Sequence, residues 1–133
     1  MKYRLFGVVV AAASLLVVAA RLDAHHGGAS FDTSKEITLA GTVTEWIWAN
    51  PHCFLKFDAK DDTGTIRNWA VETQNPVTML SRGFARRAFK PGDAVTVTLE
   101  PVKNGAPVGR MLTVLLPNSQ TLVAAGPTPA SAP

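Results

Sequence analysis

The stretch KEITLAGTVTEWIWANPHCFLKFDAKDDTGTIRNWAVET, residues 35–73, decides the fold class. Apolar and polar side chains alternate through residues 35–48, and this alternation predicts one long β-strand. Gly41 stands in the middle of that strand and indicates a bulge or a sharp bend, the device by which a small barrel turns a corner. One face of the predicted strand carries Ile37, Leu39, Gly41, Val43, Glu45 and Ile47, and the other carries Thr38, Ala40, Thr42, Thr44, Trp46 and Trp48.

Two further strands are expected in the same stretch. Asn50-Pro51 ends the first strand, because proline lacks an N–H and restricts the residue before it to extended geometry. Residues 52–59 and 66–73 then alternate again, and the turn DDTG between them ends in Gly64, which can adopt a positive φ. Residues 35–73 therefore predict a three-stranded antiparallel meander.

A short helix is expected after the meander. Asn75 is a capping residue, and Pro76 follows it at the first helical position. Val77, Leu80 and Phe84 then recur at helical spacing, which supports the prediction of a short helix.

The second half of the chain adds strands over residues 94–101 and 108–116, joined at a strong hairpin signal, Asn104-Gly105. Residues 121–124 form a last short strand. The order strand, strand, strand, short helix, strand, strand is that of the OB-fold, a small five-stranded Greek-key barrel with a helix between strands three and four. The predicted fold class is therefore all-β and OB-like. An open β-sandwich or another small barrel is the alternative, because element order alone does not fix closure.

The N-terminus has the three-part layout of a secretory signal peptide. Lys2 and Arg4 precede an apolar run over residues 5–20, and the small residue Ala24 suits cleavage by signal peptidase. The run has about 16 residues, fewer than the roughly 18–20 that cross a bilayer comfortably. The alternative is an uncleaved N-terminal anchor, since Arg21 follows the run as a stop-transfer residue would.

The expected organisation has one domain. It comprises a signal peptide over residues 1–24, an N-terminal arm over 25–35, an OB-like barrel over 36–124 and a Pro- and Ala-rich tail over 125–133. The tail is expected to be disordered, because it cannot bury enough apolar area to order itself. The mature protein would be periplasmic and would meet the membrane only through its transient signal peptide.

The charge of the mature chain argues against one class of partner. The whole chain has 13 Lys and Arg against 10 Asp and Glu. Cleavage after residue 24 removes Lys2, Arg4, Arg21 and Asp23, which leaves 10 basic and 9 acidic side chains and a formal charge of +1. Nucleic-acid binders carry a strong positive field, so nucleic acid is not expected as a partner. An unidentified periplasmic ligand or protein is expected instead.

His25 and His26 follow the predicted cleavage point and form the first candidate site. Cleavage after Ala24 would give His25 a free α-amine. An amino-terminal histidine chelates a metal through its amine and ring Nδ1, and a second imidazole completes a histidine brace that suits Cu(II). His26 or His52 could supply that second imidazole. The alternative is a solvated N-terminus whose histidines bind nothing.

The segment WIWANPH, residues 46–52, is the second candidate site. It lies in the loop between the first two strands, which helps to form the ligand surface of OB-folds. Trp46 and Trp48 share a predicted face and, with Asn50, could form a stacking platform for a saccharide, a peptide or a protein partner. Alternatively, the two rings cover the end of the barrel.

His52 and Cys53 occupy alternate positions of the predicted second strand, so they should point to opposite faces and not hold one ion together. Cys53 is the only cysteine, which excludes an internal disulfide, and we expect a buried, inert thiol; a metal ligand or an intermolecular disulfide is the alternative. Glu45 and Glu72 lie within the first and third predicted strands. An inward carboxylate there is expected to form a structural ion pair, with Arg67, Arg82 or Arg86 as partner; a catalytic role is the alternative.

The sequence lacks the motifs of the common enzyme classes. It contains no nucleophile elbow, no phosphate-binding loop, no HExxH and no paired CxxC. The sequence therefore gives no positive indication of an enzyme, and a copper-dependent oxidase has little support.

Several motifs together resemble a widespread family of exported bacterial proteins of unknown function. They are the Ala-His-His start at residues 24–26, TLAGTV at 38–43, NPH at 50–52, NWAVE at 68–72 and KPGDAVTV at 90–97. The resemblance extends over roughly residues 24–124, nearly all of the mature domain.

This resemblance implies an OB-like barrel and a periplasmic location, and it implies no established activity. The recurring histidines of the family map onto His25, His26 and His52, and its usual acidic position maps onto Glu72. Cys53 stands where an aromatic or aliphatic residue is common, which puts a ligand role for this thiol in doubt.

Overall fold

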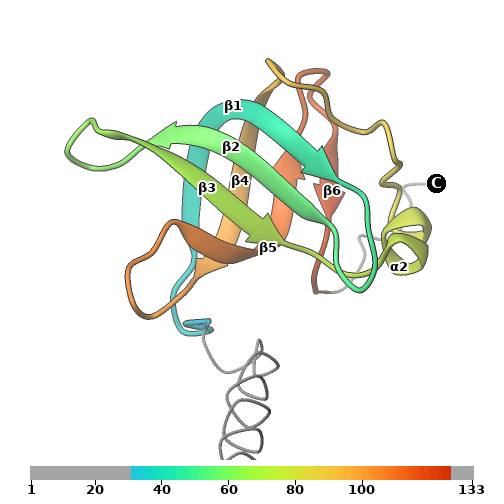
Figure 1. Cartoon of the computed structure of the whole chain (residues 1–133), viewed down its shortest axis with the longest axis horizontal. Helices are drawn as coiled ribbons and strands as arrows, with labels where there is room; N and C mark the ends of the chain where they lie inside the picture. Colours follow the sequence, from blue (N-terminus) through green and yellow to red (C-terminus); the bar gives the residue numbers. More distant parts are fainter. Residues whose placement is uncertain (1–30, 127–133) are drawn as a thin grey trace, which may run out of the picture. The chain divides into compact units, whose positions relative to one another are not determined.

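The computed structural model describes residues 31–126, and its ordered elements follow the predicted sequence of strands and helix (Figure 1). The predicted signal peptide, His25, His26 and the end of the predicted tail lie outside the described residues. No helix among the described residues is long and apolar enough to cross a membrane. The elements are β1 (Ile37–Ile47), β2 (Phe54–Lys60), β3 (Ile66–Glu72), α2 (Pro76–Ser81), β4 (Ala94–Pro101), β5 (Val108–Leu115) and β6 (Thr121–Val123).

The first five strands close into a barrel. The hydrogen-bonded order is β3-β2-β1-β4-β5-β6, and a parallel pairing between β3 and β5 joins the two ends of the five-stranded part. The long strand β1 makes closure possible, because its first half pairs with β4 and its second half with β2 (Figure 1). With α2 between β3 and β4, the predicted all-β, OB-like barrel is confirmed.

The irregularity in β1 lies at Thr44 and not at Gly41. Gly41 pairs regularly with both neighbouring strands, whereas the register against β2 shifts between Val43 and Glu45. The extra residue reverses the inward and outward faces beyond it. Glu45 therefore points outward and its carboxylate binds the Lys56 ammonium at 2.8 Å, while Trp46 lies opposite the buried Leu55. The predicted face assignment is correct up to Val43 and wrong from Glu45 onward.

Helix α2 begins as predicted, and its buried side chain is not one of the apolar residues at helical spacing. The Asn75 side chain accepts a hydrogen bond from the Thr78 N–H at 3.0 Å, which confirms the predicted cap. Met79 is the buried residue of the helix, whereas Val77 and Leu80 are 77% and 58% exposed. Six residues make fewer than two turns, so apolar spacing alone could not identify the buried face.

Aromatic side chains fill the barrel end beside α2. Phe84 and Phe89, from the segment after the helix, are buried and belong to the hydrophobic core. The Trp46 ring centroid lies 6.4 Å from that of Phe84 and 4.9 Å from that of Phe89. This packing fixes the start of the β1–β2 loop, and the candidate site follows within that loop.

Candidate functional site around His52

His52 is held by an extension of the β2–β3 pairing. The Cys53 N–H donates to the Gln74 carbonyl at 3.0 Å, and the Thr73 N–H donates to the Cys53 carbonyl at 2.9 Å. These two hydrogen bonds continue the ladder beyond Phe54, where β2 itself begins. His52 and Cys53 are therefore fixed in extended backbone although they precede the strand.

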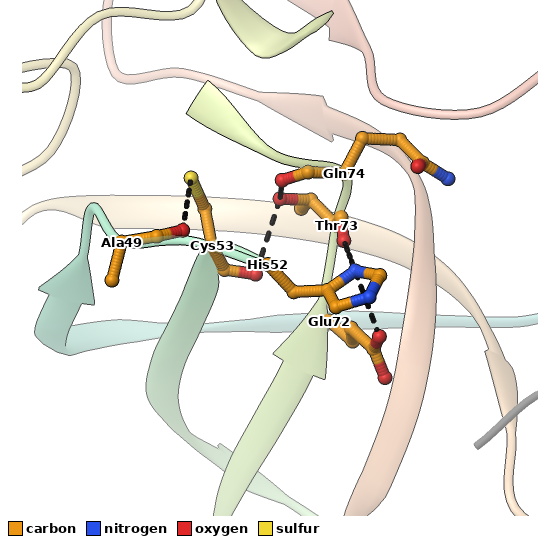
Figure 2. A network of polar contacts seen from close by, with 6 residues as sticks. All are labelled: Ala49, His52, Cys53, Glu72, Thr73 and Gln74. Atoms are coloured by element: carbon orange, nitrogen blue, oxygen red, sulfur yellow. Dashed lines mark hydrogen bonds and ion pairs between the residues drawn. The ribbon is translucent and has the colours of Figure 1, made fainter. Parts of the chain in front are cut away.

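The imidazole of His52 makes two contacts through one nitrogen (Figure 2). Its Nδ1 lies 2.8 Å from the Thr73 carbonyl oxygen and 3.0 Å from Oε1 of Glu72. Both neighbouring oxygens are acceptors, so Nδ1 carries the proton. It donates this proton to the Thr73 carbonyl, and the Glu72 carboxylate lies beside the same nitrogen as a charged neighbour. In the neutral ring, Nε2 is then the nitrogen with a free lone pair.

This arrangement presents a metal ligand or a proton acceptor at the surface. The His52 side chain is 40% exposed and that of Glu72 is 24% exposed. Histidines that bind metals commonly donate their other ring N–H to a carboxylate or a backbone carbonyl, which fixes the tautomer and makes the ligating nitrogen more basic. His52 has both kinds of partner. Within residues 31–126, no group of three His, Cys, Asp or Glu side chains could hold a metal ion.

Glu72 pairs with His52, and the predicted ion pair with Arg67, Arg82 or Arg86 is not formed. Its neighbour across the parallel ladder is Arg110, whose guanidinium binds the largely buried carboxylate of Glu100. The Arg110 guanidinium also lies 5.9 Å from the ring centroid of Phe31, the first described residue. Phe31 is thus anchored on the strand next to Glu72.

Cys53 points to the opposite side of the chain from His52, as predicted (Figure 2). Its side chain is fully buried in the barrel core, and Sγ lies 3.8 Å from the Ala49 carbonyl oxygen. Burial raises the pKa of the thiol above its ordinary value, although the hydrogen bond to Ala49 opposes the shift. The buried position agrees with the expected inert thiol.

We predict that Cys53 in the native protein resists thiol reagents. Both burial and a raised pKa lower the concentration of reactive thiolate, so modification must wait for the barrel to open. Labelling with a chromogenic disulfide at pH 8 should be at least about a hundredfold slower than in guanidinium chloride. Fast labelling of the folded protein would contradict the buried position.

Trp46, Trp48 and Asn50, which were predicted to form a stacking platform, differ in their burial and contacts. Trp46 packs against the core aromatics, and its indole N–H donates to the Ala85 carbonyl at 3.1 Å. Trp48 is half-buried with its ring centroid 5.7 Å from that of Trp46, and Asn50 is exposed. The contacts of Trp46 are those expected of a ring that covers the barrel end. A ligand-binding role for Trp46, Trp48 and Asn50 stays a prediction.

The pairing of His52 with Glu72 was not predicted, although the sequence contains a signal for it. Once Asp61 is placed opposite Thr65 across a loop of residues 62–64, counting back along both strands pairs Phe54 with Glu72. His52 then becomes a diagonal neighbour of Glu72 on the outer face, within reach of a long side chain. The hydrogen bond from His52 to the Thr73 carbonyl has no comparable signal.

Residues 11–111 of the chain match a family of unknown function (DUF6152). The match extends over most of the 133 residues, so the chain belongs to this family. Membership confirms the expected resemblance to an uncharacterised family. No curated protein and no solved structure matches the chain.

Proposed function

We propose that this chain is an exported periplasmic protein that binds a small ligand, and that the ligand is copper. The metal is held by the α-amine and imidazole of His25 after cleavage behind Ala24, with an imidazole of His26 or His52 as the further ligand. The observation that supports the proposal is the fixed ring of His52, whose Nδ1 is hydrogen-bonded to the Thr73 carbonyl and lies 3.0 Å from the Glu72 carboxylate. Between His26 and His52, this fixed ring favours His52 as the further ligand.

The orientation of His52 lowers the cost of binding a metal. A mobile imidazole loses conformational freedom when it ligates a metal, because one tautomer and one ring orientation become fixed. In His52 the Glu72 carboxylate and the Thr73 carbonyl already fix both, so less entropy is lost on binding. The His52 side chain is 40% exposed, so the imidazole can be approached from solvent. One imidazole alone binds copper weakly, so the proposal requires further nitrogen donors from the His25 end of the mature chain.

Copper is the metal that these donors suit best. An amine and two imidazoles form a nitrogen-rich, nearly planar set, the geometry that Cu(II) prefers. Copper also stands highest among divalent first-row ions in general affinity for such sites. Because the ligating nitrogens must be unprotonated, binding should weaken as the pH falls and the imidazoles become charged.

The amino terminus provides the test of this proposal. The protein beginning at His25 should bind one Cu(II) roughly a hundredfold more tightly than a form with three extra residues before His25, because the chelating amine becomes an amide. Calorimetric titration in both forms measures the difference. Three extra residues are preferable to one or two, because a histidine at the third position would create a different copper-binding motif. Equal, weak binding by both forms would refute the amino-terminal site.

A second candidate is a module that binds a saccharide, a peptide or a protein through the loop over residues 46–52, without metal. Trp46 and Trp48 are both half-buried and packed against the core, and Trp46 also donates its indole N–H to the Ala85 carbonyl, so Trp48 and the exposed Asn50 are the loop residues that this candidate uses. Trp48→Ala should then abolish binding of the partner while Cu(II) affinity stays unchanged. Unchanged binding of a saccharide or peptide partner by Trp48→Ala would reject this candidate.

A further inference from the structure

Three stretches of chain meet at the end of the barrel beside α2 (Figure 1). The Trp46 indole N–H donates to the Ala85 carbonyl at 3.1 Å, and the Arg82 guanidinium donates to the Gly126 carbonyl at 3.1 Å. These hydrogen bonds join the β1–β2 loop, the helix with the segment after it, and the end of the described chain. The stretches are residues 46–53, 73–92 and 116–126, and none of them contains Asp or Glu.

This end of the barrel carries three arginines. Arg86 and Arg87 are exposed, and they are the two central residues of the turn that the hydrogen bond from the Ala88 N–H to the Ala85 carbonyl closes. Arg82 is half-buried, and its partner at Gly126 is an uncharged carbonyl. Within residues 31–126, none of the three arginines forms an ion pair.

The carboxylates that flank these stretches do not cancel the charge of the arginines. Glu45 binds Lys56, Glu72 lies beside His52, and Asp93 lies in one turn with Lys90, whose N–H it accepts. When all of these residues are counted with the arginines, five cations stand against three carboxylates, a net charge of +2. The other charged residues of the mature chain are five cations and six carboxylates, a net charge of −1. The positive charge is therefore concentrated at the α2 end.

Helix α2 adds exposed apolar side chains at the same end of the barrel. Val77 and Leu80 are 77% and 58% exposed. They are three residues apart on the helix, so they share one face, while Met79 is the residue that packs into the core. An aliphatic pair and three arginines thus occupy one end of the molecule.

We infer that the α2 end of the barrel docks on the surface of a membrane that contains anionic phospholipids. Val77 and Leu80 enter the boundary between headgroups and acyl chains, and the guanidinium groups of Arg82, Arg86 and Arg87 bind lipid phosphates. Inserted aliphatic side chains and attraction of basic side chains to anionic lipids are the two contributions to binding at a membrane surface. The folded domain would then contact the membrane independently of the signal peptide.

The size of the apolar surface favours a membrane over a protein partner. A stable protein interface buries about 800 Å² on each partner, and two aliphatic side chains supply only a small part of that area. A lipid surface needs no matching pocket, and each basic side chain near an anionic membrane strengthens binding about fivefold. Charge and shape at the α2 end are therefore those of a weak, salt-sensitive membrane contact.

Sedimentation with lipid vesicles tests the inference. The chain beginning at His25 keeps the barrel and lacks the apolar run over residues 5–20, which would itself bind lipid. It should bind vesicles of phosphatidylglycerol and phosphatidylcholine in equal parts at least about tenfold more tightly than vesicles of phosphatidylcholine alone. Binding should weaken as sodium chloride is added. A chelator in every sample makes the result independent of copper.

Two double variants with the same change of net charge locate the contact. Arg86→Gln/Arg87→Gln should weaken binding to the anionic vesicles about twentyfold. Lys35→Gln/Lys103→Gln removes two cations beyond the start of β1 and the end of β4, away from α2, and should change binding less than about twofold. Equal losses in the two variants would overturn the inference, because attraction would then depend only on the total charge.

The apolar part of the contact has its own test. Val77→Ser/Leu80→Ser should weaken binding about tenfold without unfolding the barrel, because both side chains are exposed. An environment-sensitive fluorophore on Val77→Cys should shift to shorter wavelength with anionic vesicles. On Ile66→Cys, which is also exposed but lies about 20 Å along β3 from Glu72, it should not shift. The buried Cys53 leaves the introduced thiol as the reactive one.

The results that contradict membrane docking are distinct from these. Equal affinity for anionic and neutral vesicles, or no shift of the fluorophore at residue 77, would overturn the inference. Binding of soluble polyglutamate through Arg86 and Arg87, without binding of vesicles, would also overturn it and would indicate an acidic protein as the partner.

Discussion

Replacing Gly41 by alanine should destabilise the barrel by about 3 kcal/mol. A Cβ atom on Gly41 would lie 2.7 Å from Cδ2 of Phe57 and closer still to the carbonyl oxygen of Asp58. The nearest atom belongs to the backbone of β2, so relief requires β1 and β2 to separate at the point where Gly41 also pairs with β4. Denaturant unfolding followed by tryptophan fluorescence measures the loss.

Gly64→Ala is the matched control for that prediction. Gly64 has a φ of 83° in the β2–β3 turn, and a Cβ there would meet nothing within 4 Å. Alanine at this position should therefore cost only about 1 kcal/mol, the strain of a left-handed backbone. Similar losses for both variants would show that Gly41 is needed for its backbone freedom and not for the close approach of two strands.

Much of the fold could be predicted because its signals are local. Alternation marks the strands, and the turn glycines Gly64 and Gly105 have positive φ values, as hairpin turns require. Closure of the barrel was harder to predict from the sequence, because β3 and β5 pair over only three residues and are far apart in the chain. The bulge at Thr44 had no compositional signal, because threonine also occupies regular positions of the same strand. Gly41 is required instead by the close approach of β2.

The candidate sites could also be predicted from the sequence only in part. The sequence could identify His52 as a chemical group of interest, and alternation correctly placed Cys53 on the other face. It could not show that Nδ1 is used and Nε2 is free, because this depends on two atoms about twenty residues away.

The second large effect is expected at His52. His52→Ala should weaken Cu(II) binding by the mature chain roughly a hundredfold, because it removes one donor of a chelating set. Glu72→Ala removes one of the two contacts that orient the ring and leaves the Thr73 carbonyl in place, and at most about a tenfold loss is expected. Glu72→Gln keeps an acceptor for Nδ1–H without its charge, so its loss should be smaller than that of Glu72→Ala. Calorimetric titration at a fixed pH compares the variants.

Measurements on the copper-free protein distinguish a change in the orientation of the His52 ring from a general effect on folding. In the wild type, ¹⁵N chemical shifts of His52 should show the neutral ring protonated at Nδ1, and Glu72→Ala should increase the fraction protonated at Nε2. Glu45→Ala is the matched control, because it also breaks an exposed ion pair on the barrel surface, the pair with Lys56, and should change neither the tautomer nor the copper affinity. If Glu72→Ala shifts the tautomer while every variant binds copper like the wild type, then Glu72 orients His52 but His52 is not a ligand. The brace would then have to be completed by His26 alone.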